Sequence, residues 1–174
     1  MRVETEDMVG EDWYHYPGEA DTLKRLCQEL PECPTIVNIG TGFGTSSLIF
    51  YEARPDATIF TIDVARCDKA FETWKEAEVQ PGRIIPIRGP SGRIGEWWPW
   101  QVDMVFVDGA HSESGVAMDY TVWCPLVKAG GLLVFHDYDN PVCPHVKPIV
   151  DRMTQGRTPF LHEGYIIAFK QGQP

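Results

Sequence analysis

The stretch Thr35-Ile36-Val37-Asn38-Ile39-Gly40-Thr41-Gly42-Phe43-Gly44-Thr45-Ser46 is the most informative part of this chain. Its first residues are typical of a buried strand, alternate glycines follow, and residues 45–53 have the pattern of a helix. Glycine has no Cβ and tolerates positive φ, so backbone can approach a ligand closely where a helix presents unpaired N–H groups. The stretch therefore predicts a strand, a turn and a helix that together bind a ligand.

A second apolar run at residues 57–62 ends in Asp63. A carboxylate at the end of that strand can accept hydrogen bonds from both hydroxyls of a ribose, and it can also cap the following helix. A phosphate-binding loop requires a lysine after its last glycine, where this chain has Thr45-Ser46. The dinucleotide fingerprint G-x-G-x-x-G differs from the G-x-G-x-G spacing found here. The sequence thus favours another ribose-bearing ligand.

The composition fits one α/β domain over residues 1–174, with residues 1–16 as an irregular N-terminal arm. The net charge of −10, from 15 Lys and Arg against 25 Asp and Glu, argues against nucleic acid or anionic membrane as a partner. The five cysteines form no C-x-x-C pair and are expected to be reduced thiols. With neither a signal peptide nor a membrane-spanning run, the chain is expected to be cytoplasmic.

Apolar strands alternate with helices as far as residue 137, which predicts a Rossmann-like, doubly wound and mostly parallel sheet in a three-layer α/β/α domain with a C-terminal antiparallel hairpin. Pro86 cannot donate to a strand ladder, so its strand is expected at a sheet edge. A short stretch rich in Gly, Ser and Trp leads from that strand to the next one. Strands are predicted at residues 35–39, 57–62, 83–87, 103–107, 131–135 and in the hairpin 160–169, and helices at 17–30, 45–53, 67–77, 112–125 and 146–153.

Polar residues follow each predicted parallel strand at its carboxyl end. In doubly wound sheets this is where ligands bind. The residues concerned are Asn38 with the glycines, Asp63, Gly89-Pro90-Ser91, Asp108-Gly109-Ala110-His111 and His136-Asp137. Because polar residues follow every predicted parallel strand, we expect a single ligand site along this edge of the sheet.

Taken in order, these motifs resemble those of class I S-adenosylmethionine-dependent methyltransferases. The group they resemble within that class is the small-molecule O-methyltransferase-like one, which is marked by D-G-x-H and a later H-D-Y. The similarity covers residues 33–153 and rests on the glycine motif, Asp63, Asp108-Gly109-Ala110-His111, Asp119, Pro125-Leu126-Val127-Lys128-Ala129-Gly130-Gly131 and His136-Asp137-Tyr138. It implies S-adenosylmethionine as cofactor.

The resemblance also implies which residues bind the cofactor. Glycines of the first motif would pass beneath its methionyl part and ribose, Asp63 would bind the ribose, and Gly89 and Ser91 would line the adenine. The full implied set is Asn38, Gly40, Thr41, Gly42, Gly44, Asp63, Gly89, Ser91 and Asp108. Asn38 stands where the family usually has an acidic residue, so it supplies no charge toward the ammonium group of the cofactor.

Methyl transfer requires a positioned nucleophile and a base, and His111 with Asp108 is the predicted catalytic pair. The resemblance implies a cation site of Asp108, His136 and Asp137 for Mg²⁺ or Mn²⁺, where a histidine admits softer ions than Mg²⁺ prefers. Structural alternatives stay open: Asp137 can cap a turn, and His136 and His111 can bond to backbone or loop.

The predicted activity is methylation of a hydroxyl on a small molecule. The alternative is a module that binds S-adenosylmethionine or S-adenosylhomocysteine without transfer.

Since few residues precede the first strand, the acceptor site is expected to be closed by Trp13, Tyr14 and Tyr16, by the loop 139–147, or by a second subunit in a homo-oligomer. Cys143-Pro144-His145 is expected in a substrate loop rather than a soft metal site, and Glu96-Trp97-Trp98-Pro99-Trp100 as a cover over the sheet edge or a subunit contact.

Overall fold

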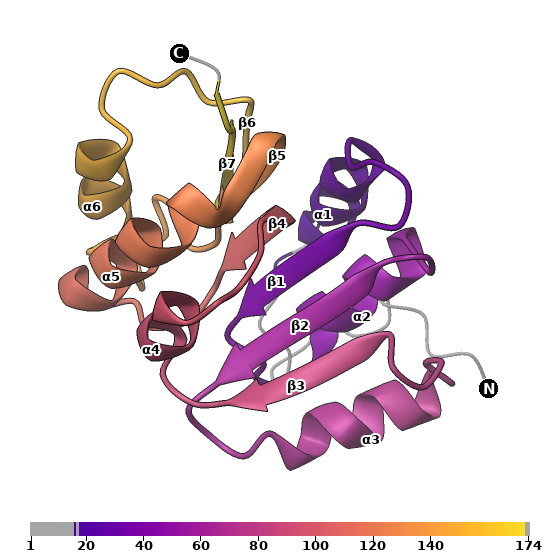
Figure 1. Cartoon of the computed structure of the whole chain (residues 1–174). Helices are drawn as coiled ribbons and strands as arrows, with labels where there is room; N and C mark the ends of the chain where they lie inside the picture. The colour runs from indigo at the N-terminus through magenta and orange to yellow at the C-terminus, as the bar shows by residue number, and fades with distance from the viewer. Residues whose placement is uncertain (1–15, 17, 173–174) are drawn as a thin grey trace.

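The computed structural model describes Tyr16 and residues 18–172, and its strands form one seven-stranded sheet (Figure 1). The strand order is β3-β2-β1-β4-β5-β7-β6, in which β1 to β5 are parallel and β7 is antiparallel to both of its neighbours. The strands are β1 Thr35–Ile39, β2 Thr58–Asp63, β3 Ile84–Arg88, β4 Val102–Val107, β5 Val127–Phe135, β6 Leu161–Glu163 and β7 Ile166–Lys170. The predicted fold class, with its C-terminal hairpin, is confirmed.

Six α-helices in the described part of the chain cover the two faces of the sheet (Figure 1). They are α1 Glu19–Gln28, α2 Thr45–Ala53, α3 Asp68–Glu76, α4 Ser91–Glu96, α5 Glu113–Trp123 and α6 Val146–Met153. Side chains of α1, α2 and α3 pack in one buried cluster with alternate strand residues, and those of α5 and α6 pack in a second cluster with the others. Because successive strand residues point to opposite faces, each central strand contributes to both cores.

Strand β3 lies at one edge of the sheet, as Pro86 predicted, and β6 lies at the other. Two predictions in the neighbouring segments were wrong. Residues 91–96 form the short helix α4, where no helix was predicted, because the segment packs on α5 through Gly95. Strand β5 begins at Val127, four residues earlier than expected, because Val127 pairs with Val102 before an irregularity in the register.

The remaining predicted elements agree with the structure to within a few residues at their ends. Of the expected N-terminal arm, only Tyr16 is described, and residues 1–15, including Trp13 and Tyr14, lie outside the described residues. No helix in the described part of the chain is long and apolar enough to cross a membrane.

The contact between α4 and α5 gives a test of packing. A Cβ on Gly95 would lie 2.4 Å from Val122 Cγ1 and 2.8 Å from Trp123 Cε2, whereas a Cβ on Gly92 would meet the flexible side chain of Met118. Overpacking costs about 1–3 kcal/mol, and alanine gains about 1 kcal/mol over glycine in a helix. Because the overlap with Val122 is severe, we expect it to outweigh the propensity gain, so that Gly95→Ala lowers the free energy of unfolding by up to about 2 kcal/mol. We expect Gly92→Ala, the matched control, to be neutral or stabilising, and equal effects in urea denaturation would contradict this account.

Candidate active site

The carboxyl ends of the parallel strands open into a cleft of about 1250 Å³. Pockets for one small ligand usually measure about 300–1000 Å³, so this cleft has room for a cofactor and an acceptor. Its lining includes most of the predicted site residues: Gly40, Thr41, Gly42, Asp63, Gly89, Ser91, Asp108, His111, His136 and Asp137. Asn38 and Gly44 are not among the lining residues.

The three glycines of the first turn have different roles. All three have positive φ, of +96° at Gly40, +49° at Gly42 and +83° at Gly44. A Cβ on Gly40 would lie 1.9 Å from the carbonyl oxygen of Asp108, and one on Gly44 would lie 2.6 Å from Trp74 Nε1, which donates a hydrogen bond to the Gly44 carbonyl. At Gly42 a Cβ would meet open space. Gly40 and Gly44 are therefore needed where neighbouring groups pack closely against the turn. At Gly42 the missing side chain leaves space in the cleft.

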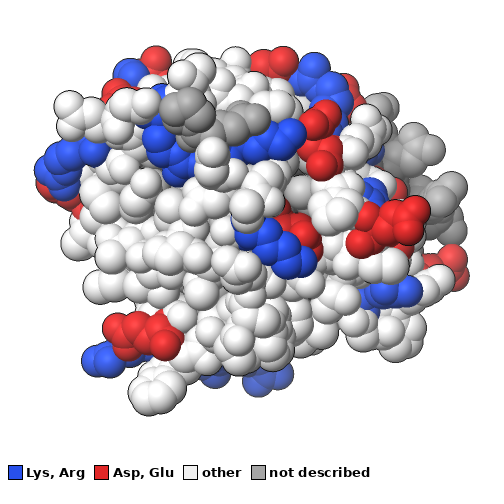
Figure 2. Space-filling view, turned by 45° about the horizontal axis from the view of Figure 1, so that its top comes forward, with Lys and Arg blue, Asp and Glu red and all other residues white. Residues whose placement is uncertain are grey.

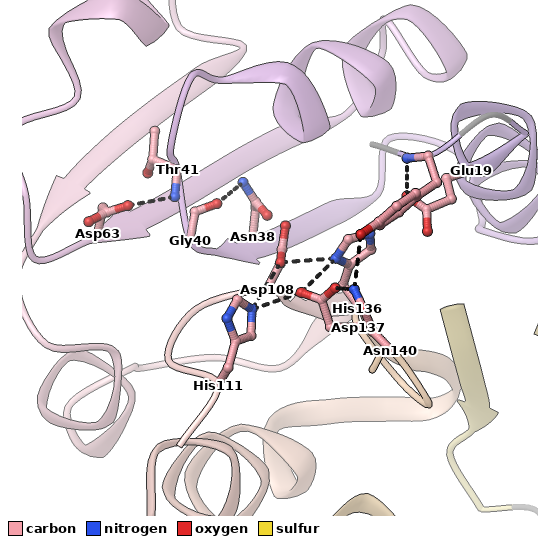
Figure 3. Close-up of polar contacts among 11 residues, drawn as sticks. Glu19, Asn38, Gly40, Thr41, Asp63, Asp108, His111, His136, Asp137 and Asn140 are labelled. Carbon is pink, nitrogen blue, oxygen red and sulfur yellow. Dashed lines mark hydrogen bonds and ion pairs between the residues drawn. The ribbon is translucent and has the colours of Figure 1, made fainter. Parts of the chain in front are cut away.

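Asp63 holds the glycine turn in place. Its Oδ2 accepts a hydrogen bond from the backbone N–H of Thr41 at 2.9 Å (Figure 3) and one from that of Gly42 at 3.2 Å, and its Oδ1 accepts one from Ala65 at 2.8 Å. A carboxylate has about four acceptor sites, so capacity remains for a ligand hydroxyl. The predicted cap of the following helix was wrong, because α3 begins after Cys67 with no side-chain cap and Asp63 binds the backbone of the glycine turn and of Ala65 instead. The binding of a ribose by Asp63 stays a prediction, and the carboxylate does line the cleft.

Asn38 points into the protein rather than into the cleft. Its side chain is fully buried, and Nδ2 donates to the Gly40 carbonyl at 3.1 Å and contacts the hydroxyl oxygens of Ser47 and Thr61 at 3.0 and 2.9 Å. Such a buried amide supports the turn from below. We expect its effect on the cofactor to be indirect, through Gly40.

Beside Asp63, whose carbonyl accepts a hydrogen bond from the Gly89 N–H, the cleft is lined by Gly89, Ser91 and a residue not predicted as part of the site. Ser91 Oγ donates a hydrogen bond of 2.5 Å to Oδ1 of Asp119, which lies on α5 and also lines the cleft. Burial raises the pKa of Asp119 above its ordinary value, and the bond from Ser91 opposes this shift. The pair offers polar groups near the position that the resemblance assigns to the adenine.

A cluster of carboxylates and imidazoles follows β4 and β5 (Figure 3). His111 Nε2 lies 2.9 Å from Asp137 Oδ2 and 3.8 Å from Asp108 Oδ1. His136 Nδ1 lies 3.2 Å from each of the same two oxygens. The structure therefore brings together all four residues that were predicted for catalysis or cation binding.

The charges in this cluster shift one another's pKa. Hydrogen bonds to Asp108 and Asp137 raise the pKa of His111 to about 9. Burial opposes a charge on His136, but Asp108, Asp137 and Glu19 outweigh it and raise the pKa. Burial likewise opposes a charge on Asp137, but bonds from both histidines hold its pKa well below its usual range. The shifts at both rings favour their protonated, charged forms, so protons and a metal ion compete for the carboxylates.

Sequence reasoning missed two residues that support this cluster. Glu19 of α1 is buried, and its Oε2 lies 2.9 Å from His136 Nε2. Asn140 is also buried, and its Nδ2 donates a short hydrogen bond to Asp137 Oδ1. Neither belongs to a motif, and Glu19 is 117 positions from its partner. Only the acidic first turn of α1 marks Glu19 in the sequence, and that is a common feature of helices.

Of the residues expected to close the acceptor site, four line the cleft, namely Tyr16, Asn140, Val142 and Cys143. Tyr16 packs edge-on against Tyr165, with ring centroids 4.7 Å apart. Burial raises the pKa of the Cys143 thiol, and His145 is exposed at the start of α6. In the tryptophan cluster, Trp98 packs on Phe60 and Trp123, and none of its tryptophans lines the cleft. This supports the expectation that the cluster covers the sheet.

The sequence model of a family described as "Methyltransferase domain" matches residues 37–138. The matched region runs from β1 through the residues that follow β5, and so contains the glycine turn, Asp63 and the cluster of Asp108, His111, His136 and Asp137. The chain belongs to this family. It is an S-adenosylmethionine-dependent methyltransferase, and the resemblance stated from the motifs is confirmed at this level.

Solved structures with the same fold have different named activities. A Staphylococcus aureus protein provisionally named a caffeoyl-CoA O-methyltransferase has a TM-score of 0.76 at 20% identity, covering 97% of this chain and 93% of that one. An rRNA methylase from Streptococcus thermophilus has a TM-score of 0.70 at 10% identity, covering 92% of this chain and 99% of that one. At these identities the likeness of the methyltransferase to either protein concerns the fold alone.

The donor atoms of the methyltransferase fit a divalent cation. Ligand atoms bound about 2.1 Å from one ion, at angles of about 90–110°, lie about 3.0–3.4 Å apart. His136 Nδ1 is 3.2 Å from Asp108 Oδ1 and 3.2 Å from Asp137 Oδ2, so the two separations fall in that range. His111, Asp137 and Cys143 are also close enough to share an ion, but the raised pKa of the thiol disfavours the thiolate that would bind one.

A substitution of Asp63 tests whether this residue binds or positions the cofactor. In Asp63→Asn an amide replaces the carboxylate that accepts from Thr41, Gly42 and Ala65, so the turn loses a charge-assisted anchor and the ligand loses an acceptor. We expect the dissociation constant for S-adenosylhomocysteine, measured by calorimetry, to rise about tenfold or more. The control Asp68→Asn removes an exposed carboxylate at the start of α3 and should leave affinity unchanged. Equal affinities of both variants would show that Asp63 does not bind or position the cofactor.

Proposed function

We propose that the protein transfers the methyl group of S-adenosylmethionine to a hydroxyl oxygen of a small molecule, with His111 as the general base. The observation that carries the proposal is the arrangement of one cleft, which has the glycine turn and Asp63 at one end and His111 with Asp137 at the other. The cleft is large enough for both reactants, and His111 is partly exposed within it.

The proposed reaction is an in-line displacement. The acceptor oxygen forms a bond to the methyl carbon, the bond from that carbon to sulfur breaks, and the sulfur keeps the electron pair in S-adenosylhomocysteine. The hydroxyl proton passes to His111. Because a carboxylate only accepts, Asp137 receives Nε2–H of His111, which leaves Nδ1 as the basic nitrogen. Positioning and proton removal are the two contributions that such a reaction requires from the protein.

Asp108, Asp137 and His136 are the residues that would hold a cation in this site. A divalent ion there would polarise the acceptor oxygen and offset the carboxylate charges that keep a proton on His111. The chain's own groups contribute independently of it: Asp137 orients His111, Asn140 fixes the carboxylate of Asp137, and Tyr16 borders the cleft.

A small acceptor is also supported by the distribution of charge. Figure 2 shows acidic and basic side chains side by side around a broad uncharged area, in a chain of net charge −10. Binding to RNA depends on Lys and Arg that neutralise successive phosphates. These features favour an uncharged or cationic small molecule over a nucleic acid as the acceptor.

His111 provides the decisive variant. In His111→Gln the residue keeps hydrogen-bonding capacity but loses the base, so we expect kcat to fall about 10²- to 10⁴-fold. The dissociation constant for S-adenosylmethionine should stay within about twofold, because the cofactor end is untouched. The assay follows transfer of a labelled methyl group to a panel of phenols, catechols and sugars.

The matched control is His162→Gln, which changes an exposed histidine of β6 outside the cleft lining and should keep full activity. An equal loss in both variants, or an unchanged rate in His111→Gln, would remove His111 from the proposal. Tight binding of S-adenosylmethionine with no transfer to any acceptor would favour the alternative of a binding module.

A further inference from the structure

Glu19 belongs to none of the methyltransferase motifs found in the sequence. It belongs to the first turn of α1, yet its carboxylate is buried and lies 2.9 Å from Nε2 of His136, on the side of that ring opposite Asp108 and Asp137 (Figure 3). The backbone N–H of Tyr16 donates to the same Oε2 at 2.9 Å. Burying a carboxylate is costly unless hydrogen bonds satisfy it, so this contact is a specific feature of the fold.

The contact determines what the His136 ring can do. An ionised carboxylate accepts and does not donate, so Nε2 of His136 carries the hydrogen that Glu19 receives. With Nε2 occupied, Nδ1 is the nitrogen turned toward Asp108 Oδ1 and Asp137 Oδ2, at 3.2 Å from each. A carboxylate behind a histidine is the usual partner of a metal-binding imidazole, because it fixes the ring and its tautomer and makes the free nitrogen more basic.

The carboxylate of Asp137 has a similar support. Its Oδ1 accepts from Asn140, and the Oδ2 on the other side faces His136 and His111. Ligating carboxylates are commonly held in this way by a hydrogen bond to their second oxygen. Two neighbouring groups are thus oriented from outside toward one point.

We propose that Glu19 is a positioning residue that fixes His136 as a nitrogen ligand, and that the site therefore prefers a first-row transition-metal ion such as Mn²⁺, Co²⁺ or Zn²⁺ to Mg²⁺. The inference deepens the proposed function, since it concerns the cation of the same site. Mg²⁺ strongly prefers oxygen ligands in an octahedral shell, whereas an imidazole nitrogen also binds divalent ions of the first transition row, with an affinity that rises from Mn²⁺ toward Co²⁺ and beyond. A donor set of one imidazole nitrogen and two carboxylate oxygens therefore favours a first-row transition-metal ion over Mg²⁺.

Glu19 has a competing structural role, which is to hold α1 against the sheet. A separate set of contacts already does this, because Glu163 of β6 accepts from Thr22 and is paired with Arg25, both on α1. Glu163 does not touch His136. Glu163→Gln is therefore a matched control: it weakens the attachment of α1 and leaves the surroundings of the imidazole unchanged.

The experiment uses full-length protein, stripped with a chelator and held at pH 8 without cofactor or acceptor. Co²⁺ binding is followed by its visible absorption, Mn²⁺ binding by loss of the free-ion electron paramagnetic resonance signal, and Mg²⁺ binding by calorimetry. We expect one Co²⁺ or Mn²⁺ per chain, bound at least tenfold more tightly than Mg²⁺. Glu19→Gln should weaken Co²⁺ binding about 10- to 100-fold, and Glu163→Gln should change it less than twofold. His136→Asn should remove the preference for Co²⁺ over Mg²⁺.

The inference is wrong if the wild-type protein binds no ion, if Mg²⁺ binds as tightly as Co²⁺, or if Glu19→Gln and Glu163→Gln have equal effects. Should His136→Asn not fold, the comparison of ions in the wild type and the pair of glutamate variants still decide the question. The methyl-transfer assay, run beside the ion-binding measurements, separates this inference from the proposed function. Methyl transfer without ion binding would overturn only the inference, whereas ion binding in a protein that transfers no methyl group would overturn only the proposed function.

Discussion

The close contact between Gly40 and Asp108 is the constraint on which the site depends. A side chain on Gly40 would collide with the Asp108 carbonyl, so only glycine lets the ends of β1 and β4 approach this closely. Backbone hydrogen bonds of 2.8 Å extend the contact, from Gly40 to Ile62 and from Asp108 to Ile39. β1 and β4 are adjacent at the point where the strand order reverses, which is where doubly wound sheets bind ligands. The cofactor turn and the catalytic loop therefore share one rigid junction.

The sequence was sufficient to predict this arrangement because parallel strands end at a common edge. Given the strands, Asp63, Asp108 and His136 follow their carboxyl ends whatever the details of packing. The glycine spacing likewise indicates where backbone must come close, and Pro86 indicates which strand lies at the edge. These predictions rest on local pattern and strand polarity, and neither depends on knowing which side chains meet across the fold.

What the sequence could not predict are contacts that arise only when distant segments pack. Asn38 belongs to the cofactor motif, but its amide turns inward because Ser47 and Thr61 offer buried partners on that side. Glu19 reaches His136 only because α1 packs on the sheet beside β4 and β5 (Figure 1). Helix α4 was missed since its six residues have weak helical propensity, with two glycines, and are held by α5. In each case tertiary packing outweighs the local signal.

Two features of the cluster are unfavourable for folding alone. Asp137 has φ of +56°, a conformation that costs a non-glycine residue on the order of 1 kcal/mol. Glu19 buries a carboxylate where an apolar side chain would pack without an ion pair. Both unfavourable features adjoin His136, and the sheet requires neither of them. They are explained if the carboxylates and imidazoles must be held in a fixed arrangement before substrate arrives, since a preorganised site need not spend binding energy on reorganising its charges during the reaction.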